Sequence, residues 1–532
     1  MTDSDDQGDG IMEDLLLPLS FDNISASSSA SLDVEALLSK QSPASLIASI
    51  IPHLFHTDAG HRSAAERLLT SILSYKPSVS TSASPSPSIN VSMLSITTAS
   101  ILSFIQTLTP STEFNISNST LQLMVNQLTH STISIADNIS NAIQSLTSIR
   151  PPLITDILEL IQPIIKKDAT VMIRCYALIF QIIPSDFMNC NENTLYEDIM
   201  QPLMDGLANE DDALLQMSLL EILETTGQNT EEGRGRTQEL IQNWDNTNLD
   251  KILLRMVGYP KGDLHPFCAG AALRILAIKG GRVHVYVHVH SHSDSLMEED
   301  PFMTGEEFVK VLLHFGRNMN GEIEKIGFID GIATFCKLSE EKLEMVLENQ
   351  ELLEEWLNLR RGQSKLKAVV MSSVSNVLMG GLELEQQQEQ VQVQAQAQDA
   401  RKRSHAIKLK LFQMIGTAND VGRGQDSSEL IMEYVKGQVV ELRLAAYELL
   451  TGVARINMGS HMLMQFGGFF EFLCNRNLEV VKEGKVLKYA LVNAVVESDV
   501  AGLLAEDIVK MLEQVVADGP FFVKQVRDVA LV

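Results

Sequence analysis

Four histidines lie on one face of a strand-like segment between residues 280 and 300. Alternation in Gly280-Gly-Arg-Val-His-Val-Tyr-Val-His-Val-His-Ser-His places His284, His288, His290 and His292 on the same side, and Asp294 could add an oxygen ligand. Imidazoles in this arrangement can bind zinc or copper. No cysteine or distant histidine is placed to complete a closed site, so a low-complexity surface insertion is favoured and we predict no metal site.

The cysteines do not form a reactive or metal-binding set. They are scattered, without a CxxC pair, which is typical of reduced thiols in a reducing compartment. Cys175 and Cys268 fall on apolar helix faces, where a thiolate would be unstable. We therefore predict no cysteine nucleophile. The full set is Cys175, Cys190, Cys268, Cys336 and Cys474.

Motifs of other chemistries are missing from the sequence. Val421-Gly-Arg-Gly-Gln-Asp-Ser-Ser has glycines but lacks the lysine of a phosphate-binding loop, and no HExxH or GxSxG occurs. The triplet Arg401-Lys402-Arg403 fits a solvated loop end, with a nuclear signal or nucleic-acid patch as the alternative. We predict that the protein is not an enzyme and has no catalytic, cofactor-binding or metal-ligating residues.

The charge balance restricts the partners. The chain has 68 acidic and 41 basic residues, a net charge of −27, which repels phosphate backbones and anionic membranes. We expect no nucleic-acid or membrane binding, and a basic protein surface is the natural complement. The N-terminus is acidic and no apolar stretch is long enough to span a bilayer. These features predict a cytoplasmic protein, with the nucleus left open as a second location.

Any site would be positioned by helices of one recurring pattern. Three segments place apolar residues at i, i+4 and i+7, on one helix face. A polar side chain follows the first apolar residue in each segment: Arg174, Gln216 and Arg443. Tyr176 and Tyr447 have core or semi-core positions, not functional ones. The three apolar sets are Ile173, Ala177 and Phe180; Leu215, Leu219 and Ile222; and Leu442, Ala446 and Leu449.

Looser copies of the pattern begin near Phe267, Ile323, Leu366 and Val486. Most successive copies start about 42 to 56 residues apart, close to the period of HEAT and armadillo repeats. Each unit exposes an apolar face until its neighbour stacks on it. We predict an all-α, right-handed α-solenoid of armadillo/HEAT type, acting as a monomer; the alternative is an irregular helical bundle.

Composition divides the chain into five segments. Residues 1–30 are acidic and Ser-rich and predict a disordered tail. Low-complexity composition marks two insertions, one His-rich and one Gln-rich, as surface loops. The segments are the tail 1–30; helical repeats 31–150 with a Ser/Pro loop at 76–90; helical repeats 151–379 with the His-rich insertion at 280–300; a Gln-rich linker 380–406; and helical repeats 407–532.

From about Pro151 onward the chain resembles a known family, most closely near its C-terminus. The resemblance lies in Leu444-Ala-Ala-Tyr-Glu-Leu-Leu-Thr-Gly-Val-Ala, Gly468-Phe-Phe-Glu-Phe-Leu-Cys-Asn-Arg, Lys488-Tyr-Ala-Leu-Val and Gly519-Pro-Phe-Phe-Val-Lys. These stretches are similar to the proteasome non-ATPase regulatory subunit 5 family, HEAT/armadillo-type assembly chaperones of the regulatory-particle base. Residues 1–130 and both insertions depart from that family's pattern.

The resemblance implies a mechanism without catalysis. Family members hold a subassembly of proteasome base AAA ATPase subunits and a large base scaffold subunit, and block premature docking to the core particle. The residues that contact these partners are not assigned by the resemblance. The alternative is a generic armadillo/HEAT scaffold or adaptor that binds another protein.

Overall fold

The computed structural model describes most of the chain. The described residues are 43–56, 88–108, 115–183, 194–225, 247–280, 304–380, 394–417, 426–456, 458–498 and 504–521, with single positions between 59 and 69 and at 502. The predicted tail, the histidine run from His284 to His292, and Cys190 lie outside them.

Every regular element in the described part of the chain is a helix, so the predicted all-α repeat fold is confirmed. The chain divides into two compact units, Met1–Thr237 and Gln238–Val532. No described helix combines the length and apolar character that a membrane crossing needs.

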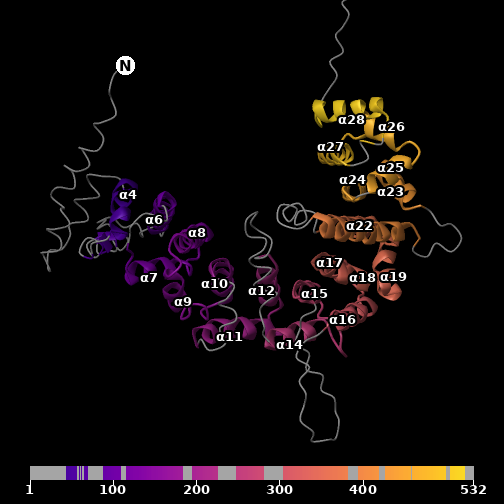
Figure 1. Ribbon diagram of the computed structural model, residues 1–532. Helices are drawn as coiled ribbons and strands as arrows, with labels where there is room; N and C mark the ends of the chain where they lie inside the picture. Colours follow the sequence, from indigo (N-terminus) through magenta and orange to yellow (C-terminus); the bar gives the residue numbers. More distant parts are fainter. Residues whose placement is uncertain are drawn as a thin grey trace, which may run out of the picture. The chain divides into compact units, whose positions relative to one another are not determined.

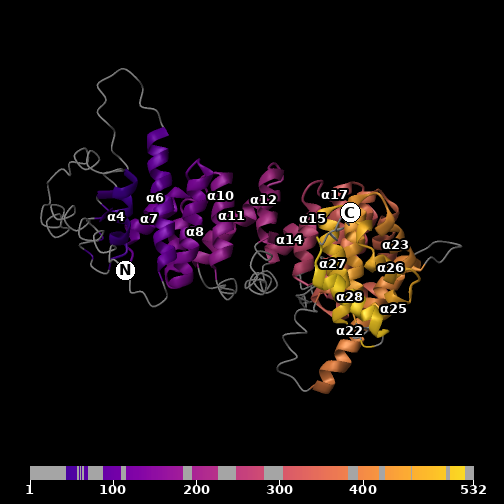
Figure 2. The same cartoon turned by 90° about the horizontal axis from the view of Figure 1, so that it is seen from above.

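The first unit is built from helical hairpins in two layers (Figures 1 and 2). Helices α6, α8, α10 and α12 each contact the next and form one layer, and α7, α9 and α11 form the other. The bounds are α4 Pro43–Leu54, α6 Ser88–Thr107, α7 Asn118–Gln127, α8 Ile133–Ile149, α9 Leu153–Ile161, α10 Ala169–Ile182, α11 Thr194–Ala208 and α12 Ala213–Thr225.

The second unit repeats this plan. Its first layer runs through α15, α17, α20, α24 and α27, each in contact with the next. The bounds are α14 Thr247–Met256, α15 Ala269–Ile278, α16 Gly305–Asn318, α17 Glu322–Leu338, α18 Glu340–Glu348, α19 Gln350–Asn358, η3 Leu359–Arg361, α20 Ser364–Met379, α22 Gln394–Thr417, α23 Ser427–Lys436, α24 Val440–Ala454, α25 Gly459–Gln465, α26 Phe469–Cys474, η4 Arg476–Leu478, α27 Lys482–Glu497 and α28 Glu506–Asp518.

The repeat starts predicted from the sequence fall on first-layer helices or, at Phe267, two residues before one; the helices are α10, α12, α15, α17, α20, α24 and α27. These helices pack against first-layer neighbours of their own unit and against the second layer, so most of their apolar residues are buried, including Tyr176 and Tyr447 as predicted. Aspartate side chains also cap the N-termini of α10 and α12. Asp168 accepts a hydrogen bond from the Val171 N–H at 2.8 Å, and Asp212 accepts one from Leu215 at 3.0 Å.

The polar residue at a fixed phase of the repeat has a common role. Gln216 donates to the carbonyl of Leu207, in the last turn of α11, at 2.8 Å. Arg174 and Arg443 donate to Leu128 and Gly437, the residues that end α7 and α23. The last carbonyls of a helix have no partner within it and attract cations. The sequence pattern therefore marks the side chains that cap neighbouring helix ends.

Basic residues outside that phase cap helix ends too. Lys408 donates to Gly380 at the end of α20 at 2.7 Å, and Arg360 donates to Ile415 in the last turn of α22. Lys342 donates to Gly280, just after α15. Both Lys408 and Arg360 are buried. A chain with a large acid excess thus places several of its cations inside the helical stack.

Three segment boundaries differ from the prediction. The Gln-rich linker was predicted for 380–406, but residues 394–406 are helical because α22 begins at Gln394; glutamine, alanine and arginine all favour helix. Arg401, Lys402 and Arg403 therefore lie on a helix, not at a loop end, with exposed side chains. The Ser/Pro loop was predicted for 76–90, but residues 88–90 are helical because α6 begins at Ser88.

The predicted boundary at residue 150 does not separate domains. Helices on its two sides are in contact, α7 with α9 and α8 with α10. The division between the two units instead falls at residue 237, inside the segment predicted as one block from 151 to 379. Hairpin stacking continues across residue 150 because the short Arg150–Pro152 connection leaves no room for a linker.

Helices α15 and α17 approach closely where two glycines face each other. A Cβ at Gly327 would overlap the Cα of Gly270 and lie 3.2 Å from its carbonyl carbon. Backbone atoms at this crossing cannot move without separating the two helices, so the crossing requires glycine at position 327, and a Cβ at Gly270 would lie in tight contact, 3.1 Å from the Gly327 Cα.

We therefore expect Gly327→Ala to lower the free energy of unfolding by about 1–3 kcal/mol, the usual cost of overpacking a core. Gly467→Ala is the matched control, because a Cβ at Gly467 meets nothing within 4 Å. Chemical denaturation followed by circular dichroism measures both. Equal stability of the two variants would contradict the close crossing.

Candidate protein-binding site

The C-terminal helices α24 to α28 enclose a group of charged side chains. Arg443 extends from α24, Arg476 and Glu479 lie in and just after η4, and Lys485 and Lys488 are on α27. The first layer supplies α24 and α27, and the short α26–η4 segment crosses between them and α28. The site is thus assembled from residues close in sequence and held by two long helices.

A buried ion pair joins α24 to the segment before α27. Arg443 Nε lies 2.8 Å from Glu479 Oε2, and its Nη2 lies 3.3 Å from Oε1. The Glu479 side chain is 1% exposed and that of Arg443 is 12% exposed. A guanidinium that meets both oxygens of a carboxylate fixes orientation as well as distance. The pair therefore sets how α27 sits against α24.

Glu479 also holds the backbone just before α27. Its Oε1 accepts hydrogen bonds from the N–H groups of Val480 at 3.0 Å and Val481 at 2.9 Å. Burial alone would raise the pKa of Glu479, but the hydrogen bonds from Arg443, Val481 and Val480 and the Arg443 charge outweigh it, so the pKa is lowered. The carboxyl is held in its charged form.

Gly484 makes room for this carboxylate. A Cβ at Gly484 would overlap the Glu479 carboxyl carbon and lie 2.7 Å from its Oε2. The first turn of α27 can therefore lie directly on the Glu479 side chain only because residue 484 has no Cβ.

Lys488 places a second cation in the same region. Its Nζ donates to the carbonyl of Asn475, at the end of α26, at 2.6 Å and lies 4.5 Å from the centre of the Phe472 ring. The residue is 6% exposed. Burial lowers the pKa of Lys488 from 10.5 to about 8, against the opposing effect of the Glu479 charge.

Arg476 links α28 to this group of charged side chains. Its guanidinium donates to Val515 at 2.9 Å and Gly519 at 3.3 Å, and contacts the Asp518 carboxylate at 3.1 Å. Gly519 ends α28. Helix α28, the last one among the described residues, is thus capped by a side chain from η4, in the same way as helices earlier in the array.

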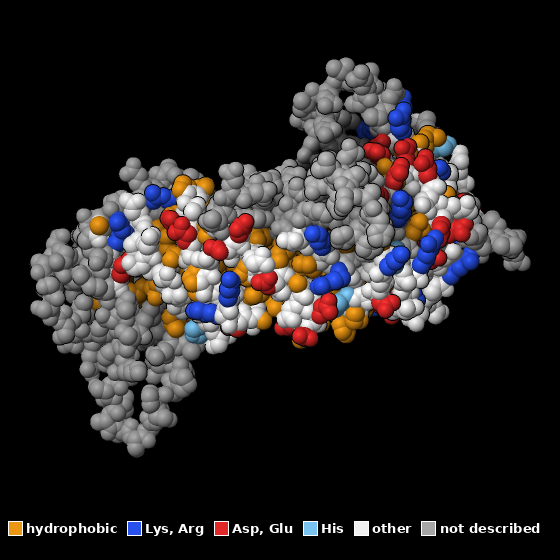
Figure 3. Space-filling model, turned by 90° about the horizontal axis from the view of Figure 1, so that it is seen from below, with side chains coloured by type: hydrophobic (Ala, Val, Ile, Leu, Met, Phe, Trp, Pro, Cys, Tyr) orange, Lys and Arg blue, Asp and Glu red, His pale blue; other side chains and the backbone are white. Residues whose placement is uncertain are grey.

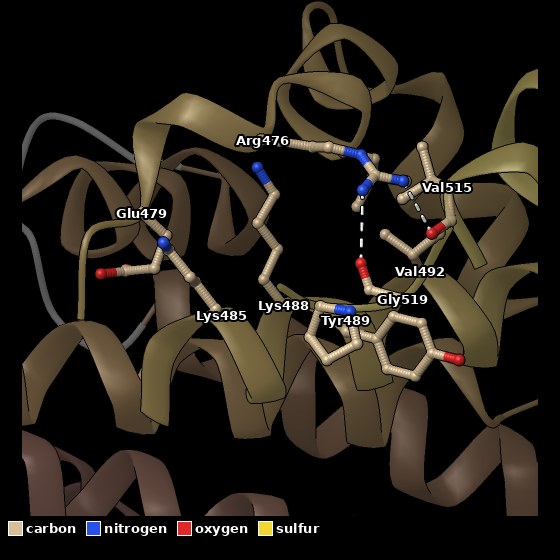
Figure 4. Close-up of a pocket in the computed structure, with 10 residues that line it drawn as sticks. Arg476, Glu479, Lys485, Lys488, Tyr489, Val492, Val515 and Gly519 are labelled. Carbon is tan, nitrogen blue, oxygen red and sulfur yellow. Dashed lines mark hydrogen bonds between the residues drawn. The ribbon is translucent and has the colours of Figure 1, made fainter. Parts of the chain in front are cut away.

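These side chains line a pocket between α27 and α28 (Figure 4). The pocket contains about 350 Å³, counting its open mouth. Figure 4 shows Lys485 and Lys488 leaving α27 on one side and Arg476 reaching across to Val515 and Gly519. The lining residues are Leu473, Arg476, Glu479, Lys485, Lys488, Tyr489, Val492, Val515, Gly519 and Pro520.

Exposed apolar side chains gather in the same part of the chain. Val480 is 79% exposed and Val486 is 44% exposed, and Leu478, Met511 and Phe521 are also exposed. Such side chains are candidates for burial against a partner. Together with the pocket they form the candidate protein-binding site.

On the face shown in Figure 3, acidic, basic and apolar side chains of the described residues are intermixed, so the acid excess does not form one continuous field there. The charge of the candidate site is set by the residues that line its pocket.

The residues with possible chemistry in the sequence do not assemble a site in the described parts of the chain. Cys175 and Cys268 are buried, and burial raises their pKa values to about 12 and about 11. No three His, Cys, Asp or Glu side chains among the described residues are grouped so that they could hold a metal ion.

The sequence interpretation missed Arg476, Glu479, Lys485 and Lys488 as a group. Lys485 and Lys488 have the i, i+3 spacing that is common on solvated helix faces. Only the tertiary packing turns that face into a pocket lining. The sequence signal that could have indicated this group is the pair Lys485 and Lys488, which follows Gly484 directly.

Comparison with known proteins adds a family match to this part of the chain. Residues 422–532 match the family described as proteasome non-ATPase 26S subunit. No curated protein matches the chain. The match covers α23 to α28, and so includes the whole candidate site.

Solved structures with similar architecture include importin beta, Kap121p and UNC-45 from Drosophila melanogaster. Importin beta is 11% identical, with 92% of this chain and 67% of that chain covered and a TM-score of 0.37. Kap121p is 10% identical, with 96% of this chain and 55% of that chain covered and a TM-score of 0.32. UNC-45 is 12% identical, with 96% of this chain and 68% of that chain covered and a TM-score of 0.29. The chain thus spans about half the length of Kap121p.

We expect Glu479→Gln to lower the free energy of unfolding by roughly 2–4 kcal/mol at neutral pH, because it leaves Arg443 without its counter-charge. The folded pKa of Glu479 is lowered from 4.5, so its contribution is present above that pH and is lost as pH falls further. The difference between wild type and variant should therefore shrink in acid. Denaturation at several pH values tests this.

The control is Glu506→Gln, which removes an exposed carboxylate paired with Lys510 on α28. Its effect should stay within about 0.5 kcal/mol. A loss of the same size in both variants would contradict the structural role of Glu479.

Lys488 predicts a trend of the same sign, with stability rising with pH, but in the alkaline range. Because its pKa is about 8 in the folded protein and 10.5 in the unfolded chain, the unfolded state binds more protons between these values. The free energy of unfolding of the wild type should therefore rise relative to Lys488→Met from about pH 8 to about pH 10. A difference that stays constant over this range would contradict the buried position of the amine.

Proposed function

We propose that this chain is a protein-binding chaperone for assembly of the proteasome regulatory-particle base. It holds a base ATPase subassembly and blocks its premature docking to the core particle. The observation that supports this most directly is the match of residues 422–532 to the proteasome non-ATPase 26S subunit family. The resemblance of Gly468–Arg476 and Gly519–Lys524 to subunit 5 chaperones names the role within that family.

The matched segment has the features that a protein interface needs. Exposed apolar side chains, Val480 and Val486 among them, offer area that a partner can remove from water. Two long helices and the Arg443–Glu479 pair hold these side chains on a rigid support. Rigid positioning reduces the entropy cost of binding.

The mechanism is binding alone, without catalysis. A helical array covers a large surface of its partner, so a base ATPase held by it is prevented sterically from docking to the core particle. Release requires only that the assembled particle competes for the same surface, because a chaperone must bind the intermediate more tightly than the product. The proposed partners are base AAA ATPase subunits and the large base scaffold subunit.

The first test is recovery of partners from the protein's own cells. Tagged chain purified at low salt should carry base ATPase subunits and the large scaffold subunit. Replacing Val480 and Val486 together by Ser should weaken this binding about tenfold or more, because apolar contacts at the interface are lost. Ile323→Ser, which removes a 65% exposed side chain outside the matched segment, is the control and should bind normally.

Docking itself gives the second readout. Added to separated base and core particle, the chain should reduce the docked complex seen by native electrophoresis, and the double Ser variant should do so less. Recovery of other proteins without any base ATPase would instead favour the scaffold or adaptor alternative. Unimpaired docking with saturating chain would overturn the blocking role.

A further inference from the structure

The pocket between α27 and α28 has a local charge opposite to that of the whole chain. Arg476, Lys485 and Lys488 line it, against a single acidic residue, Glu479. That carboxylate is already neutralised by Arg443 and by two backbone N–H groups. The pocket is therefore cationic in a protein whose net charge is −27.

The cations differ in what they can still bind. Arg476 is occupied by Val515, Gly519 and Asp518. Lys488 uses one of its three N–H donors on Asn475. Lys485 is half-buried and makes no hydrogen bond or ion pair with the described residues. Lys485 and Lys488 leave α27 on the same side, so their amino groups can act on one ligand (Figure 4).

The rest of the lining is apolar. Leu473, Val492, Val515 and Pro520 form walls, with the ring of Tyr489 beside them. The apolar surface continues outward, because Phe521 follows Pro520 and Met511 lies one turn before Val515 on α28; both are exposed. A small inorganic anion would satisfy the lysines but leave this surface in water.

The geometry points to a binding pocket for an acidic segment of a protein partner, in which a Glu or Asp carboxylate pairs with Lys485 and Lys488 and flanking apolar side chains cover Met511 and Phe521. Charge-assisted hydrogen bonds to two amines orient the carboxylate. The apolar rim excludes water around it and so strengthens the pairing. The inference deepens the proposed function and rests on it only for the identity of the partner.

The test uses the full-length protein and a short fluorescent peptide, capped at both ends, with a central Glu between Leu and Phe. Fluorescence anisotropy at low salt should detect binding. Lys485→Gln should weaken binding about tenfold, the usual cost of losing one charge-assisted contact, and Lys485→Glu should weaken it further. Lys510→Gln and Lys510→Glu make the same charge changes on α28 in an exposed pair and should change affinity no more than about twofold.

Further probes separate the carboxylate side chain from other anions. The peptide with Gln in place of Glu should bind about tenfold more weakly. A Glu-free peptide with a free C-terminal carboxylate, and inorganic phosphate, should both compete poorly. Thermal unfolding of Lys485→Gln should match wild type, because the side chain is half-buried and has no partner among the described residues.

Three outcomes would overturn the inference: no binding of the Glu peptide, equal effects of the Lys485 and Lys510 variants, or competition by phosphate as strong as by the peptide. None of these would remove the proposed chaperone role, because recovery of base ATPases is measured separately. Conversely, peptide binding without base ATPase recovery would support the pocket and reject the proposed partner.

Discussion

Stacking of apolar faces between consecutive first-layer helices is the constraint on which both units depend. No hairpin has a core of its own, because each first-layer helix is buried only where its neighbours cover it. The crossing of α15 and α17 at Gly270 and Gly327 shows how close this contact can become. Interior positions are therefore fixed by the neighbouring repeat, whereas the outer surface is free to carry function.

Stacking also leaves helix ends inside the array, and their carbonyls need donors. Long basic or amide side chains from adjacent helices donate hydrogen bonds to these carbonyls, as at Gln216, Lys408 and Arg443. In the C-terminal helices this capping of helix ends by side chains has a second effect. Arg476 and Lys488 cap helix ends and, in doing so, line a pocket that Lys485 leaves open to an anion.

The sequence predicted the parts of the fold that depend on local periodicity. Apolar steps near Ile173, Leu215 and Leu442 identified first-layer helices, since a helix face repeats within a few residues. The site was not predictable in this way. Glu479 lies 36 residues from Arg443, and nothing local marks the two as partners. The alternating Gln and Ala composition was interpreted as a loop, although those residues favour the helix that begins at Gln394.

Several lysine amines are already paired or hydrogen-bonded inside the protein, and this affects how the protein can be mapped with amine-reactive crosslinkers. The amines of Lys279, Lys408 and Lys488 are buried and held by a carboxylate or a backbone carbonyl. A reagent reacts with an amine only when it can reach it, so these buried positions will label slowly. Crosslinks will come mainly from exposed lysines such as Lys365 and Lys510. A sparse crosslink map of the helical interior would therefore reflect its chemistry and not the absence of contacts there.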